Sequence, residues 1–191
     1  SPINIIEVDS WYAPKDSLNL KIDYNSQTLI HDVINNGHTV QFDFELGDMI
    51  RYKNEVYDLK QIHFHESSEH TIDGIRFPIE IHLVHVNTTG VYTVLSILGK
   101  EGKEHIPFEF LEFFLPIENG ATKTIGKPFD LNSIFPENTE EYYSYDGSFT
   151  TPPCSETVNW IVFKQPIILS LNQVLKLKDN KFGLKGLYFD V

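Results

Sequence analysis

The chain has 191 residues, of which 41% are hydrophobic and 13% aromatic, a composition typical of a folded globular protein rather than a disordered one. The formal net charge of −12 argues against nucleic acids and anionic membrane surfaces as partners, because both are bound by basic patches. No apolar run approaches the roughly 20 residues of a membrane-spanning helix. The length suits one domain and no linker divides it, so we expect a single domain over residues 1–191.

In chain order, the sequence predicts mostly short strands separated by turns. Residues 1–5 form an extended opening, and alternating or continuous apolar patterns predict strands at 18–24, 39–45, 56–65, 77–87, 91–98 and 158–163. Asn35-Asn36-Gly37 is a turn signal. Helices are expected at 106–114 and at 170–178, the latter capped by Ser170, with a short helical turn at 131–136. Residues 145–156 are expected to form a rigid, irregular loop. The pattern indicates a mainly β fold with a largely antiparallel sheet and few short helices.

Two histidines, His63 and His65, are one residue apart in a predicted strand. Side chains in a strand alternate between the two faces, so both imidazoles point to the same side. In the second predicted strand, Glu80, His82 and Val84 share a face. If the two faces meet, His63, His65 and His82 converge, and three neutral imidazoles with an open fourth position are the ligand set of a catalytic zinc ion.

Two further polar residues support this interpretation. Gln61 and Glu80 each precede a histidine by two positions and therefore lie on the same strand face. A metal-bound imidazole usually donates its second N–H to an amide, carboxylate or carbonyl, and Gln61 and Glu80 can accept from His63 and His82. A lone histidine in a strand is nevertheless more often an ordinary core or surface residue, and the spacing alone leaves that alternative open.

Several motifs in the chain resemble those of the α-class carbonic anhydrases, and the bacterial branch most closely. They are Ser1-Pro2-Ile3-Asn4-Ile5, Asn35-Asn36-Gly37-His38-Thr39, Gln61-Ile62-His63-Phe64-His65, Ser68-Glu69-His70-Thr71, Glu80-Ile81-His82-Leu83-Val84-His85 and Ser148-Phe149-Thr150-Thr151-Pro152-Pro153-Cys154. The resemblance implies a twisted, largely antiparallel sheet with zinc at the bottom of a conical cleft. It also implies that a zinc-bound hydroxide converts CO₂ reversibly to bicarbonate and a proton.

The resemblance assigns a role to individual residues. It implies that His63, His65 and His82 bind Zn²⁺, with Gln61 and Glu80 as their hydrogen-bond partners. Thr150 matches the hydroxyl that orients the nucleophile and Glu69 matches its partner, while His38 matches the proton shuttle. The CO₂ and bicarbonate pocket is expected to be lined by Val84, Val94, Phe149 and Thr151, with Phe149 standing where the family commonly has leucine.

The chain also departs from the family pattern. An aromatic-rich segment usually precedes the Ser-Pro motif and contains a tyrosine of the proton path, and a C-terminal Asn-Arg-Pro-x-Gln segment usually orients the second zinc ligand; neither is present. The bacterial branch commonly pairs an upstream cysteine with Cys154, but Cys154 is the sole cysteine here. The chain begins at Ser1 without methionine, and we expect that it has been processed or trimmed.

Two other functions remain as alternatives. One is a cupin-type metalloprotein, although Tyr57 and Arg76 occupy the places of the glycines that this motif needs. The other is a catalytically weakened carbonic-anhydrase-like binding module. From the family we expect CO₂ and bicarbonate as the partners, a periplasmic or secreted location in a bacterium, and compatibility with a homodimer.

Overall fold

The computed structural model describes residues 1–13, 19–37, 39–112, 117–150 and 153–182. The strands are β1 (Asn4–Ile5), β2 (Lys21–Asp23), β3 (Thr28–Asn35), β4 (Val40–Phe44), β5 (Met49–Tyr52), β6 (Glu55–His65), β7 (Thr71–Ile72), β8 (Ile75–Arg76), β9 (Ile79–Val86), β10 (Tyr92–Glu101), β11 (Thr122–Phe129), β12 (Tyr142–Gly147), β13 (Val158–Phe163) and β14 (Ile167–Leu169). The helices are the 3-10 turns η1 (Glu7–Asp9) and η2 (Leu131–Ile134) and the α-helices α1 (Ile106–Glu112) and α2 (Leu171–Phe182). Among the described helices, none is long and apolar enough to span a membrane.

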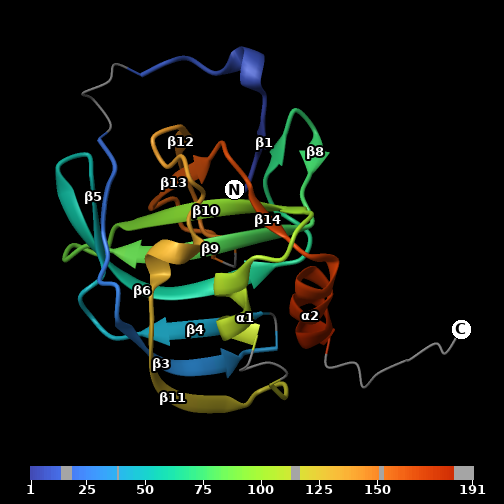
Figure 1. The fold of residues 1–191 in the computed structure, drawn as a ribbon. Helices are drawn as coiled ribbons and strands as arrows, with labels where there is room; N and C mark the ends of the chain where they lie inside the picture. Colours follow the sequence, from blue (N-terminus) through green and yellow to red (C-terminus); the bar gives the residue numbers. More distant parts are fainter. Residues whose placement is uncertain (14–18, 38, 113–116, 151–152, 183–191) are drawn as a thin grey trace, which may run out of the picture.

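Most of these strands belong to one 11-stranded sheet (Figure 1). Its main path runs β11-β3-β4-β6-β9-β10-β13-β12, while β5 pairs with β6, β2 with β5 and β14 with β10. Strand pairs in this sheet are antiparallel except that β10 pairs in parallel with β13 and β14. The expected mainly β fold, with a largely antiparallel central sheet and few short helices, is confirmed; its extent as a single domain over 1–191 stays a prediction.

The strands with a strong apolar pattern lie where the sequence predicted them. The predictions at 39–45, 56–65, 77–87, 91–98 and 158–163 correspond to β4, β6, β9, β10 and β13. Helix α2 begins after Ser170, whose Oγ accepts the backbone N–H of Gln173 at 3.3 Å, as expected for an N-cap.

Other elements differ from the prediction. The loop expected at 145–156 is shorter, because β12 extends to Gly147 and pairs with β13 along its length. The strands that were not predicted are β3, β5, β7, β8, β11, β12 and β14. Strand β11 is an exposed edge strand in which only the last residue is buried, so it lacks the apolar alternation that identifies half-buried strands.

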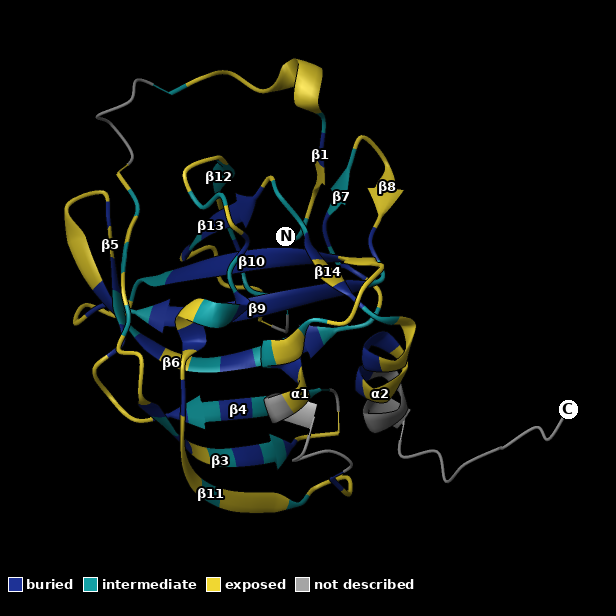
Figure 2. Ribbon diagram, in the orientation of Figure 1, coloured by how far each residue is buried: buried dark blue, intermediate teal, exposed yellow. Residues whose placement is uncertain are grey.

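Burial is deepest in the middle of the sheet (Figure 2). Strand β9 is buried at every residue from Ile79 to His85, and β10 from Thr93 to Gly99. Both strands are covered on two faces. One face of each joins the main hydrophobic core; the other face carries Glu80, His82 and Val84 on β9, and Val94 and Ser96 on β10. The continuous apolar run of β10 therefore reflects a central position in the sheet, as the sequence predicted.

A β-bulge in β6 decides which side chains face the core. The register of β6 against β9 shifts between Leu59 and Gln61. Before the shift, Tyr57 and Leu59 are buried; after it, the buried residues are Ile62 and Phe64. Because side chains alternate along a strand, the extra residue reverses which positions face the core and turns the odd-numbered positions from 61 onward to the opposite face.

Phe64 connects strand β6 to helix α1. Phe64 lies between His63 and His65 in the sequence, but its side chain points to the opposite face, into the core. Its ring lies 5.8 Å from that of Phe42 and 5.9 Å from that of Phe108 on α1. Phe108 is fully buried, whereas Ile106 on the same helix is 74% exposed. Packing of α1 against β6 therefore depends on Phe108.

We predict that Phe108→Ala lowers the free energy of unfolding by about 3–5 kcal/mol, because it removes a buried aromatic ring and leaves a cavity. Urea unfolding measures this change. Ile106→Ala is the matched control on the same helix and should change stability by no more than about 0.5 kcal/mol. Equal effects of the two substitutions would show that α1 does not pack on the sheet as described.

One histidine lies on the core face of β9. His85 is fully buried; its Nε2 lies 2.5 Å from the Tyr24 hydroxyl and its Nδ1 lies 3.2 Å from the Thr93 carbonyl. The carbonyl can only accept, so Nδ1 carries the proton and the Tyr24 hydroxyl donates to Nε2. Burial lowers the pKa of His85 to about 3. His85 is thus a neutral core residue.

This pKa makes stability depend on pH. The unfolded histidine has a pKa near 6.5, so between pH 6.5 and 3 the unfolded chain binds a proton that the folded protein excludes. Stability therefore falls as the pH drops below about 6.5, by about 1.4 kcal/mol per pH unit from this group. We predict that His85→Gln reduces the pH slope of the unfolding free energy between pH 6 and 4 by about this amount. An unchanged slope would contradict the buried, neutral state of His85.

Candidate metal centre

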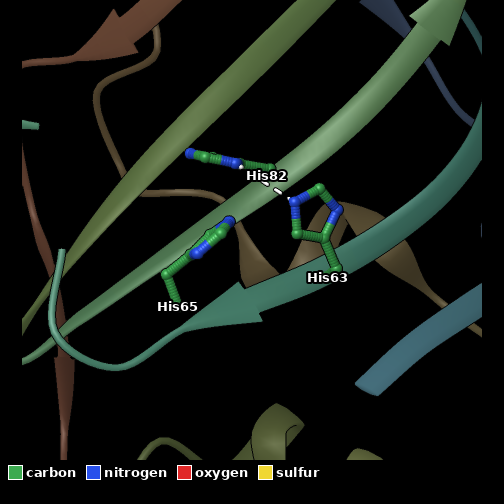
Figure 3. A group of neighbouring side chains, drawn as sticks. All are labelled: His63, His65 and His82. Carbon is green, nitrogen blue, oxygen red and sulfur yellow. Dashed lines mark hydrogen bonds between the residues drawn. The ribbon is translucent and has the colours of Figure 1, made fainter. Parts of the chain in front are cut away.

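Three imidazoles meet on the face of the sheet opposite the main core (Figure 3). His63 and His65 come from β6 and His82 from β9, and His63 is directly opposite His82 in the ladder. The ring centroids are 5.0 Å (His63–His65), 5.1 Å (His63–His82) and 4.6 Å (His65–His82) apart. His82 is buried, while His63 and His65 are half-buried, so the group can be reached from one side.

The hydrogen bonds of the outer ring nitrogens indicate which nitrogens face the centre. The Nδ1 atom of His63 lies 2.8 Å from Gln61 Oε1, and the Nε2 atom of His82 lies 2.7 Å from Glu80 Oε1. Since these oxygens accept, the two outer nitrogens carry the protons. The unprotonated Nε2 of His63 and Nδ1 of His82 then face each other at 3.3 Å.

This arrangement fits a tetrahedral metal ion. Two lone pairs at 3.3 Å repel unless a cation or proton lies between them, and two nitrogens bound to a tetrahedral zinc at 2.0–2.1 Å are about 3.3 Å apart. One nitrogen from each of the three histidines lies within 4.8 Å of the others. Burial, followed by the nearness of the His82 and His65 imidazoles, disfavours a positive charge on His63 and holds its pKa well below its usual value. His63 is therefore neutral at pH 7, as a metal ligand must be.

Glu80 is the most heavily hydrogen-bonded residue of the site. Its Oε1 accepts from His82 at 2.7 Å, His70 at 2.5 Å and Ser96 at 2.6 Å, and its Oε2 accepts the backbone N–H groups of Glu69 at 2.7 Å and His70 at 2.8 Å. Although burial favours the neutral acid, the adjacent His82 imidazole and the hydrogen bonds from His70 and His82 hold the pKa of Glu80 well below its usual value. His70, Glu80 and His82 are close enough to suggest a second metal site, but proton donors already fill the carboxylate.

Of the remaining predicted polar residues, Glu69 and Thr150 belong to the described part of the chain. Glu69 lies beside the imidazole cluster, with Oε2 3.4 Å from His65 Nε2. Thr150 is half-buried at a bend, and its hydrogen bond to Glu69 stays a prediction. His38 and Thr151 lie outside the described residues.

An apolar wall adjoins the imidazoles. Val84 and Val94 are opposite each other on β9 and β10 and form a buried cluster with Val158 and Trp160, against which Phe149 packs. The Trp160 ring lies 4.9 Å from that of His82, and its indole N–H donates to the Ser148 carbonyl at 3.2 Å. The structure thus brings Val84, Val94 and Phe149 together beside the histidines.

The sequence prediction missed the partners behind the site. Ser96 on β10, Tyr145 on β12 and His70 had no role in the predicted site. His70 joins them to the centre: its Nδ1 contacts Glu80 and its Nε2 lies 2.7 Å from the Tyr145 hydroxyl. Strand alternation alone places Ser96 on the face of Val94, but its contact with Glu80 depends on the register of β9 and β10.

Comparisons with known proteins identify the family of the chain. The family model described as "Eukaryotic-type carbonic anhydrase" matches residues 1–186. A carbonic anhydrase of Pectobacterium atrosepticum is 34% identical over 174 residues, covering 91% of this chain and 68% of the relative. A carbonic anhydrase of Neisseria gonorrhoeae is 38% identical over 165 residues, covering 86% of this chain and 62% of the relative. The chain thus spans about two thirds of the length of these relatives.

A solved structure shares the whole described fold. The α-carbonic anhydrase of Thermovibrio ammonificans, in complex with the inhibitor sulfanilamide, has a TM-score of 0.87 and 37% identity and covers 97% of this chain and 79% of its own. The enzyme from Photobacterium profundum has a TM-score of 0.83 at 30% identity, covering 99% of this chain and 86% of its own.

Proposed function

Because the chain belongs to the eukaryotic-type (α-class) carbonic anhydrase family, we propose that it binds one zinc ion and catalyses the reversible hydration of CO₂ to bicarbonate and a proton. Membership in the family confirms the resemblance of the sequence motifs and places the chain in a family of enzymes. The observation that carries the proposal is the 3.3 Å approach of two unprotonated imidazole nitrogens beside a third imidazole.

We assign the metal to His63, His65 and His82. When bound there, Zn²⁺ supplies the nucleophile, since it lowers the pKa of a coordinated water to about 7, the value known for carbonic anhydrases. Gln61 and Glu80 keep the ligand nitrogens of His63 and His82 unprotonated by accepting their outer N–H groups.

The substrate is apolar, and the site offers an apolar surface for it. Val84 and Val94 lie beside the imidazoles, and Phe149 packs against the same cluster. These apolar side chains can contact CO₂ and form no hydrogen bonds with water. Bicarbonate is charged, and we assign Thr151 to its side of the pocket.

Thr150, Glu69 and His38 complete the proposed reaction. An ionised carboxylate only accepts hydrogen bonds, so Thr150 must donate to Glu69 and use its lone pair to accept from the nucleophile. This aims the nucleophile at the carbon atom of CO₂. His38 exports the proton, because imidazole titrates near neutral pH.

Location and assembly are part of the same proposal. The family resemblance supports a bacterial periplasmic or secreted location, with CO₂ and bicarbonate as substrate and product. A homodimer is compatible with this function, but catalysis does not need one, because His63, His65 and His82 all come from one chain.

Zinc content and CO₂ hydration, measured on the same sample, test the metal assignment. Wild type should contain about one zinc per chain, and His82→Ala should lose both stoichiometric zinc and turnover, because two imidazoles leave an incomplete tetrahedral site. His31→Ala removes an exposed histidine remote from the cluster and should retain both. Full zinc occupancy in His82→Ala would contradict the assignment of the metal ligands. Zinc without turnover in wild type would favour a binding module.

The role of Thr150 is tested separately. Thr150→Ala should lower kcat by about 100-fold while zinc content stays unchanged, because an oriented hydrogen bond is lost and no metal ligand is. Thr157→Ala, at an exposed position beyond the loop, is the matched control and should leave kcat unaltered. Wild-type turnover in Thr150→Ala would show that this hydroxyl does not orient the nucleophile.

A further inference from the structure

We propose that Ser96 is a positioning residue for the metal centre: its hydroxyl holds the Glu80 carboxylate in the orientation that His82 requires. This inference rests on the proposed zinc site and adds a residue to it. Ser96 is fully buried on β10, directly opposite His82 in the antiparallel ladder with β9. Its Oγ lies 2.6 Å from Glu80 Oε1.

The direction of this hydrogen bond follows from chemistry. Glu80 is held as a carboxylate and can only accept, so the Ser96 hydroxyl must donate. The same oxygen accepts the outer N–H of His82 at 2.7 Å. Ser96 therefore orients Glu80 Oε1, the atom that keeps the proton of His82 on Nε2. In this tautomer Nδ1 of His82 is unprotonated and faces the proposed metal position.

The apolar surroundings of Ser96 in β10 indicate that its hydroxyl group needs a hydrogen-bond acceptor. Its neighbours Leu95 and Ile97 are fully buried and point to the opposite face, into the main core, and the strand is apolar along most of its length. A buried hydroxyl costs about 1–3 kcal/mol unless it is hydrogen-bonded. A hydroxyl is therefore tolerated here because it has an acceptor, and Glu80 is that acceptor.

Ser96 also donates to the carboxylate from a different strand than the other donors in the described part of the chain. Of the five hydrogen bonds to Glu80, three come from Glu69 and His70, in the segment that follows β6, and one from His82 on the same strand as Glu80. Ser96 alone donates from β10. Without it, four of the five hydrogen bonds remain, three of them from the segment after β6, and Oε1 can rotate away from His82.

The predicted consequence is weaker retention of zinc. Direct hydrogen-bond partners of metal ligands typically contribute 10–100-fold to metal affinity, and Ser96 acts one step further out. We therefore expect Ser96→Ala to release zinc to a chelator about tenfold faster than wild type, the lower end of that range. Ser96→Thr keeps the hydroxyl and should restore slow release.

The matched control is Thr93→Val, which removes a buried hydroxyl from the opposite face of β10, where Thr93 contacts Asn159 and not Glu80. Zinc release should be as slow in this variant as in wild type. Urea unfolding of the zinc-free proteins shows how far each substitution weakens the fold in general. Faster release in Ser96→Ala than in Thr93→Val, at comparable stability and with rescue by threonine, supports the proposal.

Two results would overturn it: unchanged release in Ser96→Ala, or equally fast release in Thr93→Val. Failure of the proposed function looks different, since wild type would then bind no stoichiometric zinc or would not hydrate CO₂. Wild type with zinc and turnover, combined with unchanged release in Ser96→Ala, would reject the role of Ser96 alone.

Discussion

A buried carboxylate holds the candidate site together. Glu80 is fully inaccessible to solvent, and five hydrogen bonds compensate the cost of burying its charge. Those bonds join His82, the segment that carries Glu69 and His70, and the neighbouring strand β10. The charge therefore fixes the tautomer of His82 and the path of the chain after β6 at the same time. A neutral acid at this position would have to donate one proton and would lose one of these contacts.

The second constraint is the two-sided use of β6. One face of this strand contributes Ile62 and Phe64 to the core, and the other carries His63 and His65 to the metal position. Packing of Phe64 against Phe42 and Phe108 holds the strand in register, so the same packing that stabilises the sheet also fixes the spacing of the imidazoles. Stability and site geometry are thus coupled through alternate residues of one strand.

The chain shares the central sheet of its relatives although it spans about two thirds of their length. The two segments that the family usually has and this sequence lacks belong to the ends of the chain, while β6 and β9 carry family motifs in the middle of the sheet. The three imidazoles, Gln61, Glu80 and the apolar wall all come from this middle part or from the strand beside it. The proposed metal ligands and their apolar surroundings therefore lie on the central strands of the sheet.

The sequence by itself determined the fold class, the strands with strong apolar patterns, and the shared face of His63 and His65, because strand alternation and residue chemistry are local properties. It did not determine the exposed strand β11, whose residues lack an apolar pattern, or the role of Ser96, which depends on the register of β9 and β10. The β6 bulge was equally hidden: strict alternation would turn His63 to the same side as Leu59, into the core. Only the tertiary structure decided which face His63 takes, because the extra residue of β6 is accommodated by pairing with β9. The pairing of two distant segments cannot be deduced from the sequence of either segment alone.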